Sequence, residues 1–503
     1  MSGGSLFVLG LFVTWITPVW LFSTGVALGL AALALLYGIA WIVSRRLADA
    51  ASTGVREGIL LPIFYLAIFL SLFSVLAIIL EPAIPYRELL QAVSRISSVG
   101  PTDTEIKIPP STRDFKLSPI HLRLDELTSL SAESDLPVTL LTNVQTNRLG
   151  QTLSLKLSPG SPGGWQKYFS EEKFEVESAE WSEWFVTNVN TKQATLRIHT
   201  TSDIAFPEVR IVPSTALAYL ALVLAYLAIR MIMPKVAAIA LTTSREAMSQ
   251  PLYYLALGLG SLGLVAFIYI PYNTFGEDIK MLKDSGLIWI MVWAIIIAVW
   301  SASVSVSEEV EGRTALTVLS KPVHRRQFIF GKFLGVLGPV VVLFVVLGFL
   351  FLFTISYKVV YDSREVAKSE PPWQLCYVEM IRIVPGLVLA FLETVVLAAI
   401  SVAISTRLPM LANLIVCSSI YVLGHLVPML VNSSVGKFEI VRFAGQFIAT
   451  VLPVLDHFNI QAAVAAGAVV PASYLGVACL YCALYSTIAM LLGLAMFEDR
   501  DLA

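Results

Sequence analysis

The chain has 503 residues, of which 56% are apolar and only 14% are charged, and its mean hydropathy is +0.77. A soluble domain carries about 25% charged residues, so most of this chain must be solvated by lipid. Its net charge of −2 gives no electrostatic reason to expect nucleic acid as a partner. The composition therefore predicts a polytopic α-helical membrane protein embedded in a lipid bilayer.

About ten apolar runs are long enough to cross a bilayer, whose core of about 30 Å needs roughly 20 helical residues. They lie at 5–22, 24–44, 59–80, 215–233, 252–271, 287–306, 334–357, 383–405, 411–431 and 473–497. The first two are separated by almost no polar sequence, which leaves open two spans or one bent hairpin. We expect about three transmembrane helices in 1–84, a fourth at 213–233, and a six-helix core within 234–503.

Apart from a partial exception at 358–382, with Lys358, Arg364, Lys368 and Arg382, basic residues of the short loops occur in alternate loops between the runs. The loop residues are Arg45, Arg46, Arg56, Lys235, Arg245, Arg313, Lys321, Arg325, Arg326, Lys332, Arg407 and Arg500. They all fall on one side if each run crosses once, and short basic loops stay in the cytoplasm. The pattern predicts a multi-pass protein of the cell (inner) membrane with both termini cytoplasmic.

Residues 85–212 have a different, polar composition. Short alternating stretches occur at 152–157, 184–189, 194–199 and 208–212. Period-two alternation between turn residues is typical of strands with one buried face, and this length can bury one core. We expect an extracytoplasmic β-sandwich-like domain, which is a candidate for binding an extracytoplasmic partner. None of the four cysteines falls in it, which excludes a disulfide framework there.

The segment 234–251 is predicted to form an amphipathic surface helix. Its apolar stripe at helical spacing consists of Val236, Ile239, Ala240, Thr243 and Ala247. Arg245 and Glu246 lie off that stripe. Such a helix is expected to lie along the membrane with its apolar face in the headgroups.

The stretch 307–332, SEEVEGRTALTVLSKPVHRRQFIFGK, joins two apolar runs. Its distinctive residues are acids, a glycine, a proline and basic side chains: Glu308, Glu309, Glu311, Gly312, Arg313, Pro322, Arg325 and Lys332. The glycine would end one helix and the proline would open the next. A solvated loop obeying the positive-inside rule explains the arginines but not the acids, the glycine or the proline, so we interpret the stretch as a docking surface.

This stretch, following a surface helix and a pair of spans, resembles the type-2 ABC-transporter permease family. The matching residues are Glu308, Gly312, Arg313, Thr314, Val318, Ser320, Pro322, Val323, Arg325, Phe328, Ile329, Gly331 and Lys332. Further similarity lies at Glu393 with Ser405-Thr406, at 452–460 and at 497–502. The resemblance covers about 234–503 and leaves out the first four spans and the polar insert.

The resemblance implies a cytoplasmic ABC ATPase subunit as partner and a homo- or hetero-dimer of permease chains. ATP and Mg would then be bound by the ATPase, with no cofactor bound directly by this chain. The sequence agrees, because it contains no GxxxxGK[ST] phosphate loop. It also has no GxSxG, no HExxH and no Cys/His cluster at ligand spacing, so we predict no catalytic residues and no metal site.

Glu393 is the one carboxylate well inside a predicted span. Placing an ionised group there costs about 2.5–3.5 kcal/mol, so its side chain must face protein or water. It is a candidate for an intramembrane pathway or for helix packing, and His425 in the next span is a candidate partner.

The sequence therefore predicts a permease subunit that couples ATP hydrolysis in a separate chain to movement of a substrate it does not identify. Two alternatives remain. One is an ATPase-driven membrane scaffold that acts mechanically on an extracytoplasmic partner. The other is an ion-driven secondary transporter, which would normally carry more intramembrane carboxylates.

Overall fold

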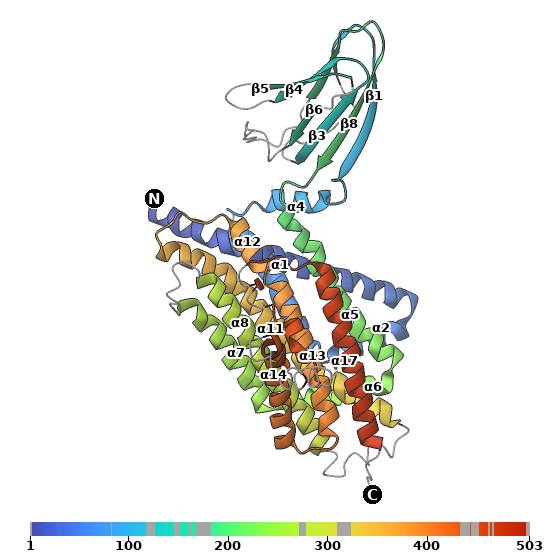
Figure 1. Ribbon diagram of the computed structural model, residues 1–503, viewed down its shortest axis with the longest axis vertical. Helices are drawn as coiled ribbons and strands as arrows, with labels where there is room; N and C mark the ends of the chain where they lie inside the picture. Colours follow the sequence, from blue (N-terminus) through green and yellow to red (C-terminus); the bar gives the residue numbers. More distant parts are fainter. Residues whose placement is uncertain are drawn as a thin grey trace. The chain divides into compact units, whose positions relative to one another are not determined.

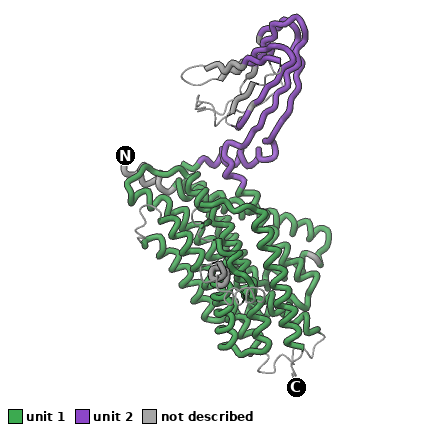
Figure 2. The backbone as a smooth tube through the Cα atoms, in the orientation of Figure 1, with its two compact units in different colours: residues 1–84, 211–503 green, residues 85–210 purple. Residues whose placement is uncertain are grey.

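A computed structural model describes most of the chain. The described residues are 3–81, 83–116, 126–144, 151–159, 163–166, 183–270, 278–308, 323–432, 443, 452–460, 463–464 and 467–498. They form two compact units, a helical unit at 1–84 and 211–503 and an inserted unit at 85–210 (Figure 2). Each unit is described separately below.

The helical unit is built from long apolar helices (Figure 1). Its helices are α1 (Gly3–Val43), α2 (Arg45–Arg56), α3 (Leu61–Leu80), α5 (Ile211–Ile232), α6 (Pro234–Ser249), α7 (Pro251–Tyr269), α8 (Asp278–Ala302), the π-helix η2 (Ser303–Glu308), α11 (Arg325–Glu365), α12 (Trp373–Ile381), α13 (Val384–Ser405), α14 (Met410–Asn432), the short 3₁₀ helix η4 (Leu455–Phe458) and α17 (Ala472–Glu498). Eight helices among the described residues are long and apolar enough to cross a membrane, and α14 contains a shorter apolar stretch. The predicted class, a polytopic helical membrane protein, is confirmed.

The first two predicted spans form one helix. Residues 5–22 and 24–44 both belong to α1, which is continuous for 41 residues. The expectation of two spans or a hairpin is therefore wrong. No glycine–proline pair or polar turn separates the runs, and Pro18 lies inside the helix without ending it.

The helix α6 packs along α11 at a row of glycines. A Cβ atom added at Gly331 would lie 2.8 Å from Ile239, and one added at Gly335 would lie 2.6 Å from Thr243. Small residues four apart let helix backbones approach closely in membranes. The predicted apolar stripe of α6 is thus largely buried against protein, and its expected burial among lipid headgroups is wrong.

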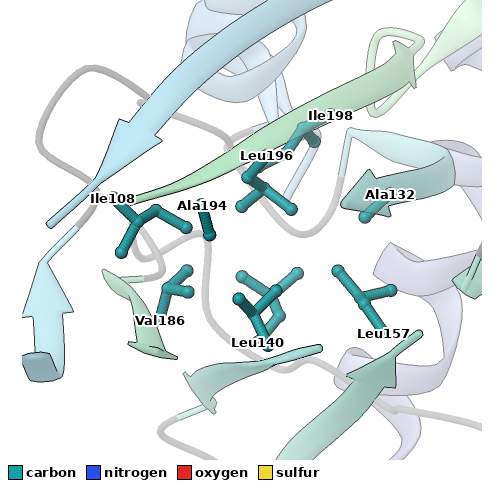
Figure 3. Close-up of a cluster of buried hydrophobic side chains, with 9 residues drawn as sticks. Ile108, Ala132, Leu140, Leu157, Val186, Ala194, Leu196 and Ile198 are labelled. Carbon is teal, nitrogen blue, oxygen red and sulfur yellow. The ribbon is translucent and has the colours of Figure 1, made fainter. Parts of the chain in front are cut away.

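The inserted unit contains two four-stranded antiparallel sheets. Its elements are α4 (Tyr86–Arg95), β1 (Pro101–Ile108), β2 (Thr112–Lys116), β3 (Leu127–Ser134), β4 (Val138–Val144), β5 (Gln151–Leu157), β6 (Gly163–Gln166), β7 (Glu183–Asn188), β8 (Ala194–Ser202) and the 3₁₀ turn η1 (Pro207–Arg210). The strand orders are β1-β8-β3-β6 and β2-β7-β4-β5. Both sheets contribute to one buried cluster, where Leu196 and Ile198 of β8 and Leu140 of β4 are at most 2% exposed (Figure 3).

The alternating pattern correctly predicted three strands of this unit, and its fourth predicted strand is wrong. The stretches 152–157, 184–189 and 194–199 coincide with β5, β7 and β8. The stretch 208–212 is not a strand, because Pro207 opens a 3₁₀ turn that leads directly into α5. Five residues of alternation are too few to separate a strand from the first turns of a helix.

We predict that Gly335→Ala lowers the thermal stability of the purified protein by about 1–3 kcal/mol, because the new methyl group must displace Thr243. Gly348→Ala in the same helix is the matched control, since its Cβ would meet no atom nearer than 3.7 Å. Thermal unfolding in detergent measures both. Equal stability of the two variants would refute close packing of α6 on α11.

Candidate functional site

A hydrogen bond joins α6 to α11 near Pro339, a proline inside α11. Pro339 lies inside α11 and has no N–H, which leaves the carbonyl of Gly335, four residues earlier, without its helical donor. Ser244 of α6 donates its hydroxyl to that carbonyl oxygen at 2.6 Å. Tyr253 of α7 donates to the carbonyl of Pro339 at 3.3 Å. The proline of α11 is therefore the point at which α6 and α7 are attached to it.

Two arginines bind the C-terminal end of α17. Arg325, at the first residue of α11, donates to the carbonyl of Glu498 at 2.9 Å and lies 5.9 Å from the ring centroid of Phe497. Arg407, after α13, donates from Nε to the carbonyl of Met496 at 2.7 Å. The last carbonyls of a helix lack helical donors and carry partial negative charge, which basic side chains satisfy.

These contacts bring several chain segments to one end of the helical unit, which we call the basic end. It comprises α6, η2, the start of α11, the α13–α14 turn and the end of α17. The exposed basic residues there are Lys235, Arg245, Arg325, Arg326 and Arg407. In Figure 1 this is the end of the helical unit where α6 lies beside the lower part of α17.

A buried carboxamide connects three elements of the basic end. Asn413 of α14 is 0% exposed, and its Nδ2 lies 2.7 Å from the hydroxyl of Ser303 in η2. The same nitrogen lies 2.9 Å from the hydroxyls of Ser401 and Ser405 in α13. In addition, Ser307 donates to the carbonyl of Leu408 at 3.1 Å. The π-helix η2 is thereby bonded to α14 and to the turn between α13 and α14, and Asn413 connects it to α13.

Five of the eight predicted coupling residues fall outside the part of the chain that the structure describes. Glu309, Glu311, Gly312, Arg313 and Pro322 lie outside the described residues. Glu308 ends η2, and only its backbone is described.

Two predicted coupling residues whose side chains are described, Arg325 and Lys332, contact other parts of this chain. Arg325 is exposed but holds the end of α17. Lys332 is 3% exposed and lies 5.6 Å from the ring centroid of Phe328, so it does not present a docking surface. The α6 contact encloses this turn of α11, and the predicted role of Lys332 in ATPase coupling stays a prediction.

The two polar residues predicted on α6 are exposed. Arg245 donates to the backbone carbonyl of Glu57, beyond the end of α2, and Glu246 lies beside it on the same face. Arg230 of α5 reaches the Glu57 carboxylate at 3.8 Å. The surface of α6 is therefore continuous with the N-terminal part of the helical unit.

Glu393 and His425 lie together. Glu393 of α13 is 0% exposed, and its Oε1 is 3.5 Å from Nε2 of His425 in α14. Within the part of the chain that the structure describes, neither carboxylate oxygen of Glu393 has a hydrogen-bond donor. The pair is the only one of the predicted sites to bring a buried acid and a base into contact among the described residues.

Two buried lysines occupy the other end of the helical unit, the far end. Lys283 of α8 is 0% exposed and is paired with Glu379 of α12. Lys358 of α11 is 3.0 Å from Asp362 and donates to the carbonyl of Ile268 at 2.8 Å. Intramembrane charges need such partners. The first pair joins α8 to α12, and Lys358 joins α11 to α7 through the carbonyl of Ile268.

A cluster of acidic side chains lies beside Lys358. Carboxylate oxygens of Asp278, Asp362 and Glu365 lie within 4.8 Å of one another. The ammonium group of Lys358 already supplies a positive charge to Asp362. We interpret the cluster as an ion-pair network.

Sequence reasoning missed Ser244, Asn413 and Arg407. A signal for the first was present in Gly331, Gly335 and Pro339, since close-packing glycines followed by a proline require a donor from a neighbouring helix. A signal for the second was an amide inside an apolar run, which must find partners in lipid. Neither signal identifies the residue at the other end of the hydrogen bond, because Ser244 is distant in sequence from Gly335 and Ser303 is distant from Asn413.

A scan against protein-family models and a search of curated proteins found no match to this chain. Its functional assignment therefore depends on the residues and contacts described above.

We predict that Ser244→Ala destabilises the protein by about 1–3 kcal/mol, because the carbonyl of Gly335 stays buried without a donor. Ser249→Ala on the same helix is the control, since Ser249 is exposed and bonds only within α6. Thermal unfolding in lipid nanodiscs compares them. Equal melting temperatures would contradict the role of the Ser244 hydroxyl.

We predict a loss of similar size, about 1–3 kcal/mol, for Asn413→Leu, which keeps the branching at Cγ but removes the shared donor. The exposed Ser419→Ala on the same helix should leave stability unchanged. Hydrogen exchange adds a local measurement, with faster exchange expected in η2. Unchanged exchange there would show that Asn413 does not hold the π-helix.

Proposed function

We propose that this chain is the membrane subunit of an ATP-driven transporter of the type-2 ABC permease kind, acting with a separate cytoplasmic ATPase. The main support is that the helices on both sides of the segment 309–322 are hydrogen-bonded to other helices of the core. Before it, η2 is bonded to α14 and to the α13–α14 turn; after it, α11 is held by α6 and α17. A force applied to this segment would therefore reach the whole helical core.

The proposed direction of force follows from helix stiffness. The helix α11 is 41 residues long and runs from the basic end to the far end, where Lys358 and Asp362 lie in its last turns. A displacement of its first turn would be carried along its axis, while α6 moves with it through the glycine contact. The opening or closing of a pathway between chains would result from this movement.

We place the basic end in the cytoplasm by the positive-inside rule. Since α1 is one helix, the eight candidate spans together with α14 give an odd number of crossings among the described residues. The N-terminus then lies outside and the C-terminus inside, which revises the expectation that both are cytoplasmic. Packing of Trp15 on Tyr357, near the far end of α11, supports this arrangement.

In the same proposal, the inserted unit is an extracytoplasmic β-sandwich. It joins the end of α3 to the start of α5, which would both lie outside in this topology. One buried cluster shared by its two sheets supports an independently folded domain that captures or hands on a substrate or partner.

The pair Glu393–His425 favours a second candidate, an ion-driven secondary transporter. Buried acids and bases in membranes are typical of proton relays. The two candidates differ in the energy source: the first requires a nucleotide-hydrolysing partner, and the second requires only an ion gradient across the vesicle.

We predict that charge reversal of Glu308, Glu309 and Glu311 to lysine lowers copurification of a coexpressed ABC ATPase chain from the same genome by about tenfold, roughly 1.4 kcal/mol. These acids would otherwise pair with basic residues of that ATPase. The control is Glu370→Lys, an exposed acid beyond the opposite end of α11. Quantitative pull-down and ATPase stimulation provide the measurements.

If the triple variant retains both copurification and ATPase stimulation, the docking role is refuted. If vesicles move solute with an ion gradient and no ATPase, the secondary-transporter candidate replaces the first.

A further inference from the structure

The pair Glu393–His425 has a hydrogen-bond arrangement that requires an additional proton. Nδ1 of His425 lies 3.0 Å from the backbone carbonyl oxygen of Tyr421. A carbonyl oxygen only accepts hydrogen bonds, so Nδ1 carries a hydrogen and donates it. In a neutral ring the other nitrogen, Nε2, is then an acceptor with a lone pair.

That lone pair faces a second acceptor. Nε2 lies 3.5 Å from Oε1 of Glu393, and an ionised carboxylate has no hydrogen to donate. Two acceptors facing each other in a buried, low-dielectric site repel, and an unpaired buried carboxylate is strongly disfavoured. A single proton on either atom resolves both problems.

The surrounding groups offer no other neutralising charge. On α14, Tyr421 lies with its ring centroid 4.8 Å from that of His425. On α17, the thiol of Cys482 donates to the carbonyl of Leu392 at 3.4 Å, and so serves the backbone rather than the carboxylate. Among the described residues, no lysine or arginine lies within ion-pair distance of Glu393.

Among the described elements, α8, α11 and η4 also pack against α13 or α14. The buried lysines of α8 and α11, Lys283 and Lys358, are paired with Glu379 and Asp362. Leu455 packs against Gly424 of α14, where an added Cβ would lie 2.8 Å from its Cγ. The titratable side chains of η4, Asp456 and His457, are exposed.

We propose that Glu393 and His425 form an intramembrane proton-binding site that holds one proton between α13 and α14. The side chain of His425 is 22% exposed, whereas Glu393 is fully enclosed, so His425 is the more accessible member of the pair. When the pair is closed, the proton is shared; when α13 and α14 separate, the carboxylate loses its base and retains the proton, or releases it to water. Movement between these two helices is therefore linked to protonation.

This inference is independent of the energy source proposed above. An ATP-driven permease would use the pair to stabilise one arrangement of α13 and α14, and an ion-driven one would use it as a carrier site. The test therefore measures protonation itself.

The experiment uses the full-length protein in lipid nanodiscs at about pH 8, where a free glutamate is ionised and a free histidine is neutral. Infrared spectroscopy detects a protonated carboxyl by its C=O stretch and the shift of that band in D₂O. Nitrogen NMR of ¹⁵N-histidine distinguishes an imidazolium from a neutral ring, and His425→Gln assigns the signal of His425.

We expect either a protonated-carboxyl band that Glu393→Gln removes, or an imidazolium at His425 that Glu393→Gln converts to a neutral ring protonated at Nδ1. Glu379→Gln is the matched control, because Glu379 is paired with Lys283 and is expected to be ionised already. It should leave both signals unchanged.

An ionised Glu393 beside a neutral His425 would overturn the proposal. So would a carboxyl band that survives Glu393→Gln when no imidazolium is present at His425. If Glu393→Gln does not fold, Glu393→Asp keeps the carboxyl group and must shift the band, while the histidine spectrum of the unsubstituted protein still reports on His425.

Discussion

The helical unit depends on the need to satisfy every backbone polar group where no water can do so. In lipid an unpaired carbonyl costs several kcal/mol, and only another protein group can replace the missing donor. Pro339 creates such a carbonyl at Gly335, and Ser244 supplies the donor from a different helix. This one hydrogen bond fixes the register of α6 along α11, and the neighbouring glycines bring the two backbones close enough for it to form.

The same constraint explains the rest of the basic end. The final carbonyls of α17 are satisfied by Arg325 and Arg407, which come from two different parts of the chain. Asn413 satisfies hydroxyls of η2 and α13 in a fully buried position. A π-helix leaves its backbone less regularly bonded than an α-helix, and such turns are common at functional positions. The polar contacts therefore concentrate where the chain enters and leaves the segment 309–322, which is also where a partner would act.

Two arrangements of buried ionisable groups differ in their partners. At the far end, Lys283 and Lys358 have carboxylate partners, and Lys283 joins α8 to α12 as an ion pair. In the interior, the ionisable partner of Glu393 among the described residues is the imidazole of His425. The first arrangement is suited to a fixed structure, because breaking it would leave a buried charge. The second can exist with its proton on either partner, which makes it suitable for a movable contact.

The sequence alone determined the membrane class, the position of the polar insert, the strands β5, β7 and β8, and the candidate pairing of Glu393 with His425. Hydrophobic runs, alternation and an isolated carboxylate are local signals, and each reports directly on burial. Tertiary structure decided that 5–44 is one helix, that α6 is buried against protein, that Lys332 is enclosed, and that Arg325 caps α17. These outcomes depend on which distant surface meets each segment. The periodicity of a segment specifies only which face of its helix or strand is apolar. Which other segment packs against that face depends on helices that are far away in the chain.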